Sequence, residues 1–105
     1  MDDAFTHFET HGAELQSDYP YTGRDGTCTE EKKTAQVKVT KFADVPAGDQ
    51  NQLAAAIQKG PVSVAIEADR LCFQFYSGGV LDSTSCGQNL DHGVTAVGYG
   101  FDTKS

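Results

Sequence analysis

The sequence has few basic residues, no tryptophan and no long hydrophobic run. Its 8 lysines and arginines stand against 15 acidic residues, giving a net charge of −7 at pH 7. This balance argues against a nucleic-acid partner, which would require a basic face. No apolar run is long enough to span a membrane, so a membrane partner is not expected either. The first residues, Met-Asp-Asp-Ala, lack the basic and apolar parts of a signal peptide, which says nothing about the targeting of a longer parent protein.

Three cysteines are also too few to pair completely within one chain. There is no Cys-x-x-Cys motif, and no pair of histidines lies near a cysteine, so the usual zinc-site spacings are missing. His7 and His11 have the i, i+4 spacing of a metal clip on a helix, but the sequence indicates no third ligand. We therefore expect neither a metal ion nor a cofactor.

The composition is that of an ordinary globular domain, with 38% hydrophobic and 22% charged residues. Residue patterning predicts both helices and strands. A strand that alternates apolar and polar residues should be half-buried, and Asp49 should cap a helix whose buried stripe is Leu53, Ala56 and Ile57. The expected elements are a helix over 2–11 ended by Gly12, a loop over 17–28, a strand over 37–42, a helix from Asp49 to Lys59, a strand over 62–67 and a helical turn over 70–76.

One polar, titratable residue, His92, begins an apolar strand in the stretch Asn-Leu-Asp-His-Gly-Val-Thr-Ala-Val-Gly-Tyr-Gly, residues 89–100. Because strand side chains alternate, His92, Val94 and Ala96 should share one face, and we expect the imidazole to be partly desolvated. Histidine is the side chain most easily tuned to exchange protons near neutral pH. On this pattern alone, a hydrogen-bonded structural histidine is the more common outcome.

The exact residues of four segments change this expectation for His92. Leu-Asp-His-Gly-Val followed by Ala-Val-Gly-Tyr-Gly resembles the histidine segment of papain-family cysteine peptidases, closest to the cathepsin L-like branch. The resemblance covers residues 1 to about 101, and the segments occur in the family's order. The other three are Tyr19-Pro20-Tyr21 with Cys28, Gly60-Pro61-Val62-Ser63-Val64-Ala65-Ile66-Glu67-Ala68, and Phe73-Gln74-Phe75-Tyr76 through Gly79-Val80.

The resemblance implies an α+β, papain-like fold. Residues 1–36 would form the C-terminal part of a helical left lobe with the crossing loop, and residues 37–105 most of a β-barrel-like right lobe. His92 would be the partner of a catalytic cysteine, holding it as a thiolate and later protonating the leaving amine. The positions that match substrate-binding residues, with a preference for a hydrophobic P2 side chain, are Met1, Ala65, Leu90, Asp91 and Gly93.

Two of the family's segments are missing from the chain. They are the Gln-x-x-x-Cys-Gly-Ser-Cys-Trp segment with the nucleophile and the Asn-Ser-Trp-Gly segment with the orienting asparagine. We therefore expect an internal segment of a peptidase that is inactive by itself. Two alternatives stay open: a silicatein-like or otherwise inactive relative serving a structural or binding role, and a free-standing small binding module.

The same resemblance implies roles for the cysteines, the compartment and the partners. Cys28 and Cys86 would form disulfides with cysteines outside the chain, whereas Cys72 has no family counterpart and would be a small buried or half-buried thiol. Disulfides imply an oxidising route, so the parent should be lysosomal or secreted. Its partners would be protein or peptide substrates, with cystatin-type or propeptide inhibitors.

Overall fold

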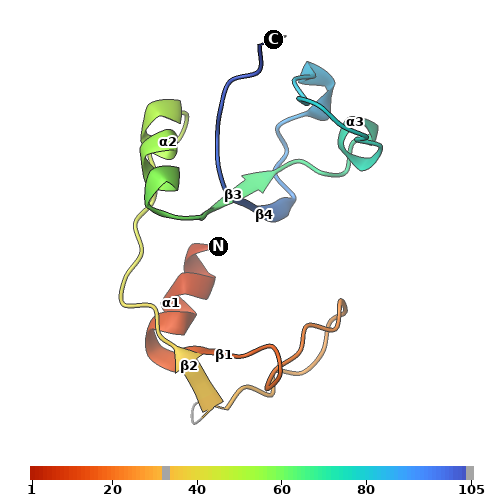
Figure 1. Ribbon diagram of the computed structural model, residues 1–105. Helices are drawn as coiled ribbons and strands as arrows, with labels where there is room; N and C mark the ends of the chain where they lie inside the picture. Colours follow the sequence, from red (N-terminus) through yellow and green to blue (C-terminus); the bar gives the residue numbers. More distant parts are fainter. Residues whose placement is uncertain (32–33, 104–105) are drawn as a thin grey trace. The chain divides into compact units, whose positions relative to one another are not determined.

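The protein is described by a computed structural model covering residues 1–31 and 34–103. The chain forms two compact units, unit 1 from Met1 to Asp44 and unit 2 from Val45 onward. Strand β2, at Ala35–Val37, pairs with β1, at Ala13–Glu14, and both strands belong to unit 1. Figure 1 shows the elements of each unit in chain order.

Unit 1 begins with helix α1, Asp2–His11. Asp2 and Asp3 lie in its first turn, where acidic side chains favour the positive end of the helix dipole, and His11 lies in its last. Gly12 ends the helix with φ 73°, and its N–H donates to the Phe8 carbonyl at 3.1 Å. The predicted helix and its glycine end are confirmed.

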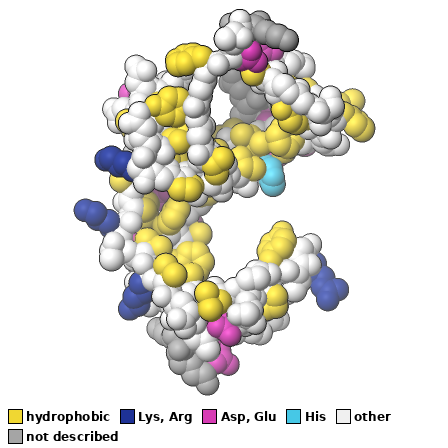
Figure 2. All heavy atoms as spheres, viewed as in Figure 1, with side chains coloured by type: hydrophobic (Ala, Val, Ile, Leu, Met, Phe, Trp, Pro, Cys, Tyr) yellow, Lys and Arg dark blue, Asp and Glu magenta, His cyan; other side chains and the backbone are white. Residues whose placement is uncertain are grey.

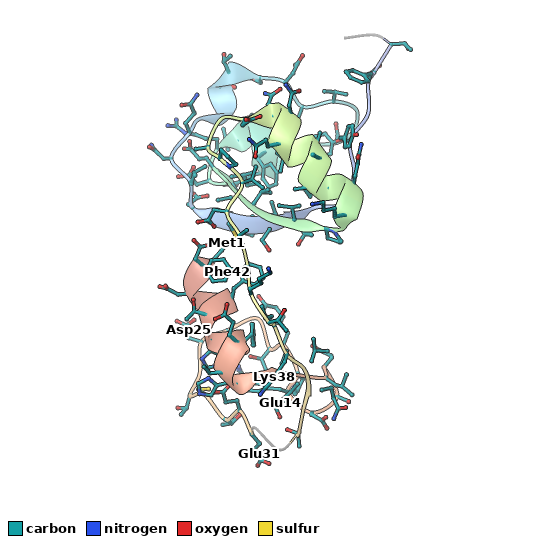
Figure 3. All side chains as sticks on the ribbon, turned by 90° about the vertical axis from the view of Figure 1, so that its left-hand side faces the viewer. Met1, Glu14, Asp25, Glu31, Lys38 and Phe42 are labelled. Atoms are coloured by element: carbon teal, nitrogen blue, oxygen red, sulfur yellow. A yellow bond between two sulfur atoms is a disulfide. The ribbon has the colours of Figure 1, made fainter. Side chains whose placement is uncertain are left out.

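The strand expected over 37–42 is mostly absent. The short antiparallel ladder pairs Ala13 with Val37 and Glu14 with Ala35, and residues 38–42 form no strand. Strand β1 has only two residues, so residues 38–42 have no strand residues with which to extend the ladder. The Val39 N–H donates instead to the Phe8 carbonyl of α1 at 3.4 Å. The chain instead returns along α1, where the Phe42 ring stacks on Phe5 with centroids 5.7 Å apart, and Figure 3 shows Phe42 near the start of the helix.

The expected loop over 17–28 is confirmed, and polar side chains hold the segment around it. The Tyr19 hydroxyl accepts a hydrogen bond from the Thr29 N–H at 3.1 Å. The Glu14 carboxylate accepts from the Glu31 N–H at 3.2 Å and from the Thr34 hydroxyl. Lys32 and Lys33, which follow Glu31, lie outside the described residues.

Unit 2 contains helix α2, Gln50–Lys59, with the predicted cap. The Asp49 carboxylate accepts from the Gln52 N–H at 3.0 Å, which satisfies a donor that the helix itself leaves free. The apolar stripe of Leu53, Ala56 and Ile57 is half-buried rather than buried. No other described hydrophobic side chain of the protein is fully buried either.

Strands β3, Val62–Ile66, and β4, His92–Ala96, form an antiparallel pair in unit 2. Their register sets Val64 opposite Val94, Ala65 opposite Gly93 and Ile66 opposite His92. Both strands fall where the sequence predicted them, although β3 stops one residue before the predicted end. Valines and isoleucine fit the pleated surface and favour this pairing.

A disulfide joins the helical turn α3, Leu71–Gln74, to the 3-10 turn η2, Thr84–Cys86. It links Cys72 to Cys86, whose Cα atoms lie 5.5 Å apart. The expectation that Cys86 pairs outside the chain, and that Cys72 is an unpaired thiol, is therefore wrong in this structure, because the two turns bring these side chains together. Cys28 is free and exposed.

The described residues bury little apolar surface. Glu67, at 5% exposure, is the one buried polar side chain reported among them, and large side chains such as Tyr21, Phe75 and Val97 are more than three-quarters exposed. Figure 2 shows hydrophobic side chains open on the surface of the molecule. In the part of the chain that is described, no helix combines the length and apolar character needed to cross a membrane.

Candidate functional site

Five of the six predicted site residues meet in unit 2, on and just before the β3–β4 pair. Ala65 lies on β3, Leu90 and Asp91 directly precede β4, and His92 and Gly93 begin it. The sixth, Met1, precedes α1 in unit 1. The strand register thus brings together residues separated by more than 20 positions in the sequence.

His92 is the first residue of β4 and faces Ile66 across the ladder. The predicted alternation is confirmed, since Val94 and Ala96 follow on the same face and are half-buried. The imidazole itself is exposed, whereas partial desolvation was expected. Its place at the end of a two-stranded sheet explains the difference, because among the described residues no third strand lies beside β4.

The opposite face of the sheet carries the smallest side chains of the site. Ala65 and Gly93 are direct cross-strand partners, and neither places any atom beyond Cβ above the sheet. Side chains of such a pair lie about 5 Å apart, so a larger residue at either position would project over its partner. Leu90, at 65% exposure, supplies an apolar side chain just before the strand.

Asp91 joins the start of β4 to the end of β3. Its N–H donates to the Ile66 carbonyl at 2.9 Å, and its carboxylate accepts from the Ala68 N–H at 2.7 Å. Both hydrogen bonds serve a structural role. They extend the ladder by one residue and fix the backbone from which the His92 side chain emerges.

The sequence did not indicate a role for Glu67, which holds the loop that precedes β4. The carboxylate accepts from the Arg70 Nε–H and from the Asn89 N–H, each at 2.8 Å. The hydrogen bond from Arg70, followed by that from Asn89, holds the pKa of Glu67 below its ordinary value. The pKa of Asp69 is raised, first by its hydrogen bond with Glu67, because one of two adjacent carboxyls keeps a proton more readily.

Gly87 lies directly against this carboxylate. A Cβ at position 87 would stand 1.9 Å from Oε2 of Glu67, and the residue has φ 83°, a conformation that favours glycine. The loop over 87–89 therefore contacts the Glu67 carboxylate, and Leu90 and His92 follow it in the chain. The available sequence signal was an acid at the end of an apolar strand with an arginine three residues later.

The described residues of unit 2 contain no free thiol. Cys72 and Cys86 are joined to each other, and the free Cys28 belongs to unit 1. His92 therefore has an exposed ring that can accept or donate a proton, but no cysteine in its own unit to activate. Among the described residues, the cluster of three metal-ligand side chains is in unit 1, where His7, His11 and Glu30 meet.

Comparison with known proteins assigns the whole chain to one family. The sequence profile described as papain family cysteine protease matches residues 1–105. Similar curated proteins include cysteine protease 1 of Oryza sativa subsp. japonica, 47% identical over 100% of this chain and 22% of its own length. Cathepsin L of Sarcophaga peregrina is 45% identical over 97% of this chain and 31% of its own length.

Solved structures agree with this assignment. The digestive procathepsin L 3 of Tenebrio molitor larval midgut matches with a TM-score of 0.88 and 42% identity, over 98% of this chain and 34% of that one. The bromelain protease of Ananas comosus in complex with the E64 inhibitor matches with a TM-score of 0.86 and 33% identity, over 98% and 47%. The chain thus spans less than half the length of each of these relatives and has their α+β fold.

Proposed function

Because the chain belongs to the papain family of cysteine proteases, we propose that it is a segment of a cysteine endopeptidase in which His92 is the acid–base residue. The observation that carries this proposal is the position of His92, exposed at the start of β4, where the next rung of the ladder is the small pair Ala65 and Gly93. An exposed imidazole on a paired strand can approach both a thiol and a substrate without a large backbone movement.

The nucleophile would come from a cysteine outside these 105 residues. His92 would take the thiol proton, and the resulting thiolate would attack the carbonyl carbon of the scissile peptide. The imidazolium would then give its proton to the leaving amine as the carbon–nitrogen bond breaks. In the second half, His92 would take a proton from water, which would cleave the acyl–sulfur bond and restore the free thiol.

A hydrophobic P2 residue would bind beside the Ala65–Gly93 pair. Small side chains on this face leave volume for a large one from the substrate, and Leu90 adds apolar surface. The backbone of Asp91 would lie along the bound peptide. Apolar contacts of this kind discriminate substrates by about 1–3 kcal/mol for one methylene group.

The parent would act in a lysosomal or secreted setting. The Cys72–Cys86 disulfide is compatible with an oxidising route of synthesis. Its partners would be peptide substrates together with propeptide or cystatin-type inhibitors. One solved relative is a procathepsin, and another is a complex with the E64 inhibitor.

The decisive experiment measures peptide hydrolysis by the full natural protein that contains this chain. His92→Ala should lower kcat/KM by at least about four orders of magnitude, since members of such a unit act together. The matched control is His11→Ala, which removes a histidine of unit 1 and should retain activity. Equal activity of His92→Ala and the unchanged protein would refute the proposed role.

Iodoacetamide separates a cysteine peptidase from a relative with serine at the nucleophile position. Alkylation should abolish hydrolysis in the unchanged protein and also in Cys28→Ser, which removes the free thiol of unit 1. Resistance to alkylation together with hydrolysis would indicate a serine nucleophile. No hydrolysis at all, in a protein that folds, would favour the inactive or silicatein-like alternative.

The P2 preference has its own test. Ala65→Phe should fill the space beside Gly93 and lower kcat/KM for a substrate with Phe at P2 by about 10–100-fold. The same variant should lose much less activity toward a substrate with Ala at P2. Equal losses for both substrates would place the P2 side chain elsewhere.

A further inference from the structure

Three side chains with metal-ligand atoms meet in unit 1, whereas His92 belongs to unit 2. His7 and His11 lie on α1, and Glu30 lies on the loop that follows Cys28. Their ligand atoms all lie within 4.8 Å of one another. Nε2 of His7 is 2.8 Å from Oε2 of Glu30, and Nε2 of His11 is 3.9 Å from Oε1 of the same carboxylate.

The helix sets the two imidazoles side by side. At i, i+4 spacing they occupy one face of α1, and their rings are parallel to within 3° with centroids 4.2 Å apart. Both Nε2 atoms consequently point to the same carboxylate. The sequence suggested this histidine pair but gave no third ligand, because Glu30 is 19 residues beyond His11 and reaches it only through the fold.

Hydrogen bonds at His11 leave its Nε2 free to coordinate. Nδ1 lies 3.1 Å from the His7 carbonyl oxygen and 2.8 Å from the Thr10 hydroxyl, which itself donates to the same carbonyl. A carbonyl can only accept, so Nδ1 of His11 carries the hydrogen and Nε2 of the neutral ring carries the lone pair. A backbone carbonyl that holds the other ring nitrogen is the usual support of a metal-binding histidine.

The loop that supplies Glu30 is fixed on both sides of it. The Thr29 N–H donates to the Tyr19 hydroxyl at 3.1 Å, and the Glu31 N–H donates to the Glu14 carboxylate at 3.2 Å. Glu30 is thus presented to the helix by two hydrogen bonds that involve its immediate neighbours. This arrangement lowers the ordering cost of bringing a third ligand to the histidine pair.

The donor set favours zinc. Two imidazole nitrogens and one carboxylate oxygen are common zinc ligands, and ligands of a tetrahedral zinc ion at about 2.1 Å lie about 3.4 Å apart. The separations of 2.8 and 3.9 Å to Glu30 bracket that value. The side chains are 40%, 33% and 26% exposed for His7, His11 and Glu30, so an ion can enter and keep a water ligand.

We propose that His7, His11 and Glu30 form a zinc site that ties α1 to the loop over residues 19–31. The ion takes the place of the proton between Nε2 of His7 and Glu30, which is released to the solvent, and it bridges α1 and the loop directly. Because only the folded arrangement brings the three ligands together, zinc stabilises unit 1. The site is independent of His92 and of peptide hydrolysis.

The test is calorimetric titration of the full chain with zinc chloride, combined with NMR of the histidine rings. One zinc ion should bind per chain, and the Nε2 resonances of His7 and His11 should shift while that of His92 stays unchanged. His7→Ala, His11→Ala and Glu30→Gln should each weaken binding by more than about tenfold. Alanine favours helix, so the first two variants should keep α1, which circular dichroism checks.

Two control variants separate this site from other zinc binding. Glu9→Gln removes a carboxylate of α1 outside the cluster, and Cys28→Ser removes the free thiol; both should bind zinc as the unchanged chain does. Unchanged affinity in Glu30→Gln would overturn the three-ligand site in favour of a simple histidine clip. Loss of binding in Cys28→Ser, or no shift of the two Nε2 resonances, would equally overturn it.

Discussion

The two units of the protein are stabilised by different kinds of contact. Unit 2 has a capped ten-residue helix, two paired strands of five residues each, a disulfide and a nearly buried carboxylate. Unit 1 has one ten-residue helix and a ladder of two and three residues. Its long loop is fixed by the Tyr19 hydroxyl, the Glu14 carboxylate and the contacts of Glu30.

The difference shows two ways to order a chain that buries little apolar surface. In unit 2 the order comes from backbone pairing and covalent closure, which depend weakly on any single polar side chain. In unit 1 it comes from single side chains that reach across 10 to 23 residues, so each of them matters for one particular stretch of loop. A substitution in unit 2 should accordingly destabilise several of its elements, whereas a substitution in unit 1 should affect only the segment that it contacts.

The largest expected effect follows from opening the disulfide of unit 2. Cys72→Ser removes a link across 14 residues, and a loop of that size is worth about 3 kcal/mol in the chain-entropy description. Hydrogen exchange of the Phe75 amide, which donates to the Leu71 carbonyl in α3, should accelerate accordingly. Cys28→Ser is the matched control and should leave that amide unchanged; an equal effect of both would show that the disulfide is not what orders α3.

The next largest effect is expected from alanine substitution at Gly87, compared with the same substitution at Gly48. Both glycines belong to unit 2 and have similar backbone conformations. Gly87 and Gly48 have φ 83° and 76°, but only a Cβ at Gly87 meets Glu67, while Gly48 has open space around it. Gly48→Ala should cost about 1 kcal/mol from backbone strain, and Gly87→Ala about 2–3 kcal/mol. Exchange of the Asn89 amide measures the difference, and equal costs would mean that the Glu67 contact adds nothing.

A smaller and local effect is expected in unit 1. Tyr19→Phe removes the hydroxyl that accepts from the Thr29 N–H and should cost about 1 kcal/mol, detected as faster exchange of the Thr29 amide. The helix α1 should keep its exchange pattern. Tyr21→Phe changes a tyrosine that is 86% exposed and should have no measurable effect. Loosening of the whole unit by Tyr19→Phe would contradict the local character of its contacts.

The smallest effect is confined to acid. Since the folded-state pKa of Glu67 is lowered, chiefly by Arg70, its stabilising contribution is present above the ordinary glutamate pKa of about 4.3 and is lost as pH falls through the lower folded value. The Asn89 amide resonance should therefore move below about pH 4 and stay constant at neutral pH. Glu67→Gln should abolish this movement; a shift centred near neutral pH would assign it to another group.

Locally encoded elements were predictable from the sequence. The Asp49 cap and the Lys-Gly-Pro end defined α2, and apolar alternation with β-branched residues defined β3 and β4. The family resemblance then indicated the α+β fold and named His92. These signals lie within a few residues of one another, so no knowledge of the tertiary structure is needed to read them.

The remainder depended on contacts between distant residues. The alternation over 37–42 predicted a strand, but β1 was too short to pair with it. The Cys72–Cys86 disulfide required the turns α3 and η2 to approach each other, and family resemblance indicated a different partner for Cys86. Glu67 and Glu30 acquire their roles from Asn89 and the α1 histidines, which no periodicity in the sequence connects to them.

The β3–β4 pair described above also has a consequence for solubility. In the described part of the chain, it is a sheet of two strands, so each strand has one outer edge with backbone groups that no other strand satisfies. Such edges are templates on which a further strand, from the same or another molecule, can add. Val97 and Phe75, in the same unit, are also exposed apolar side chains. The isolated chain should therefore aggregate as its concentration rises.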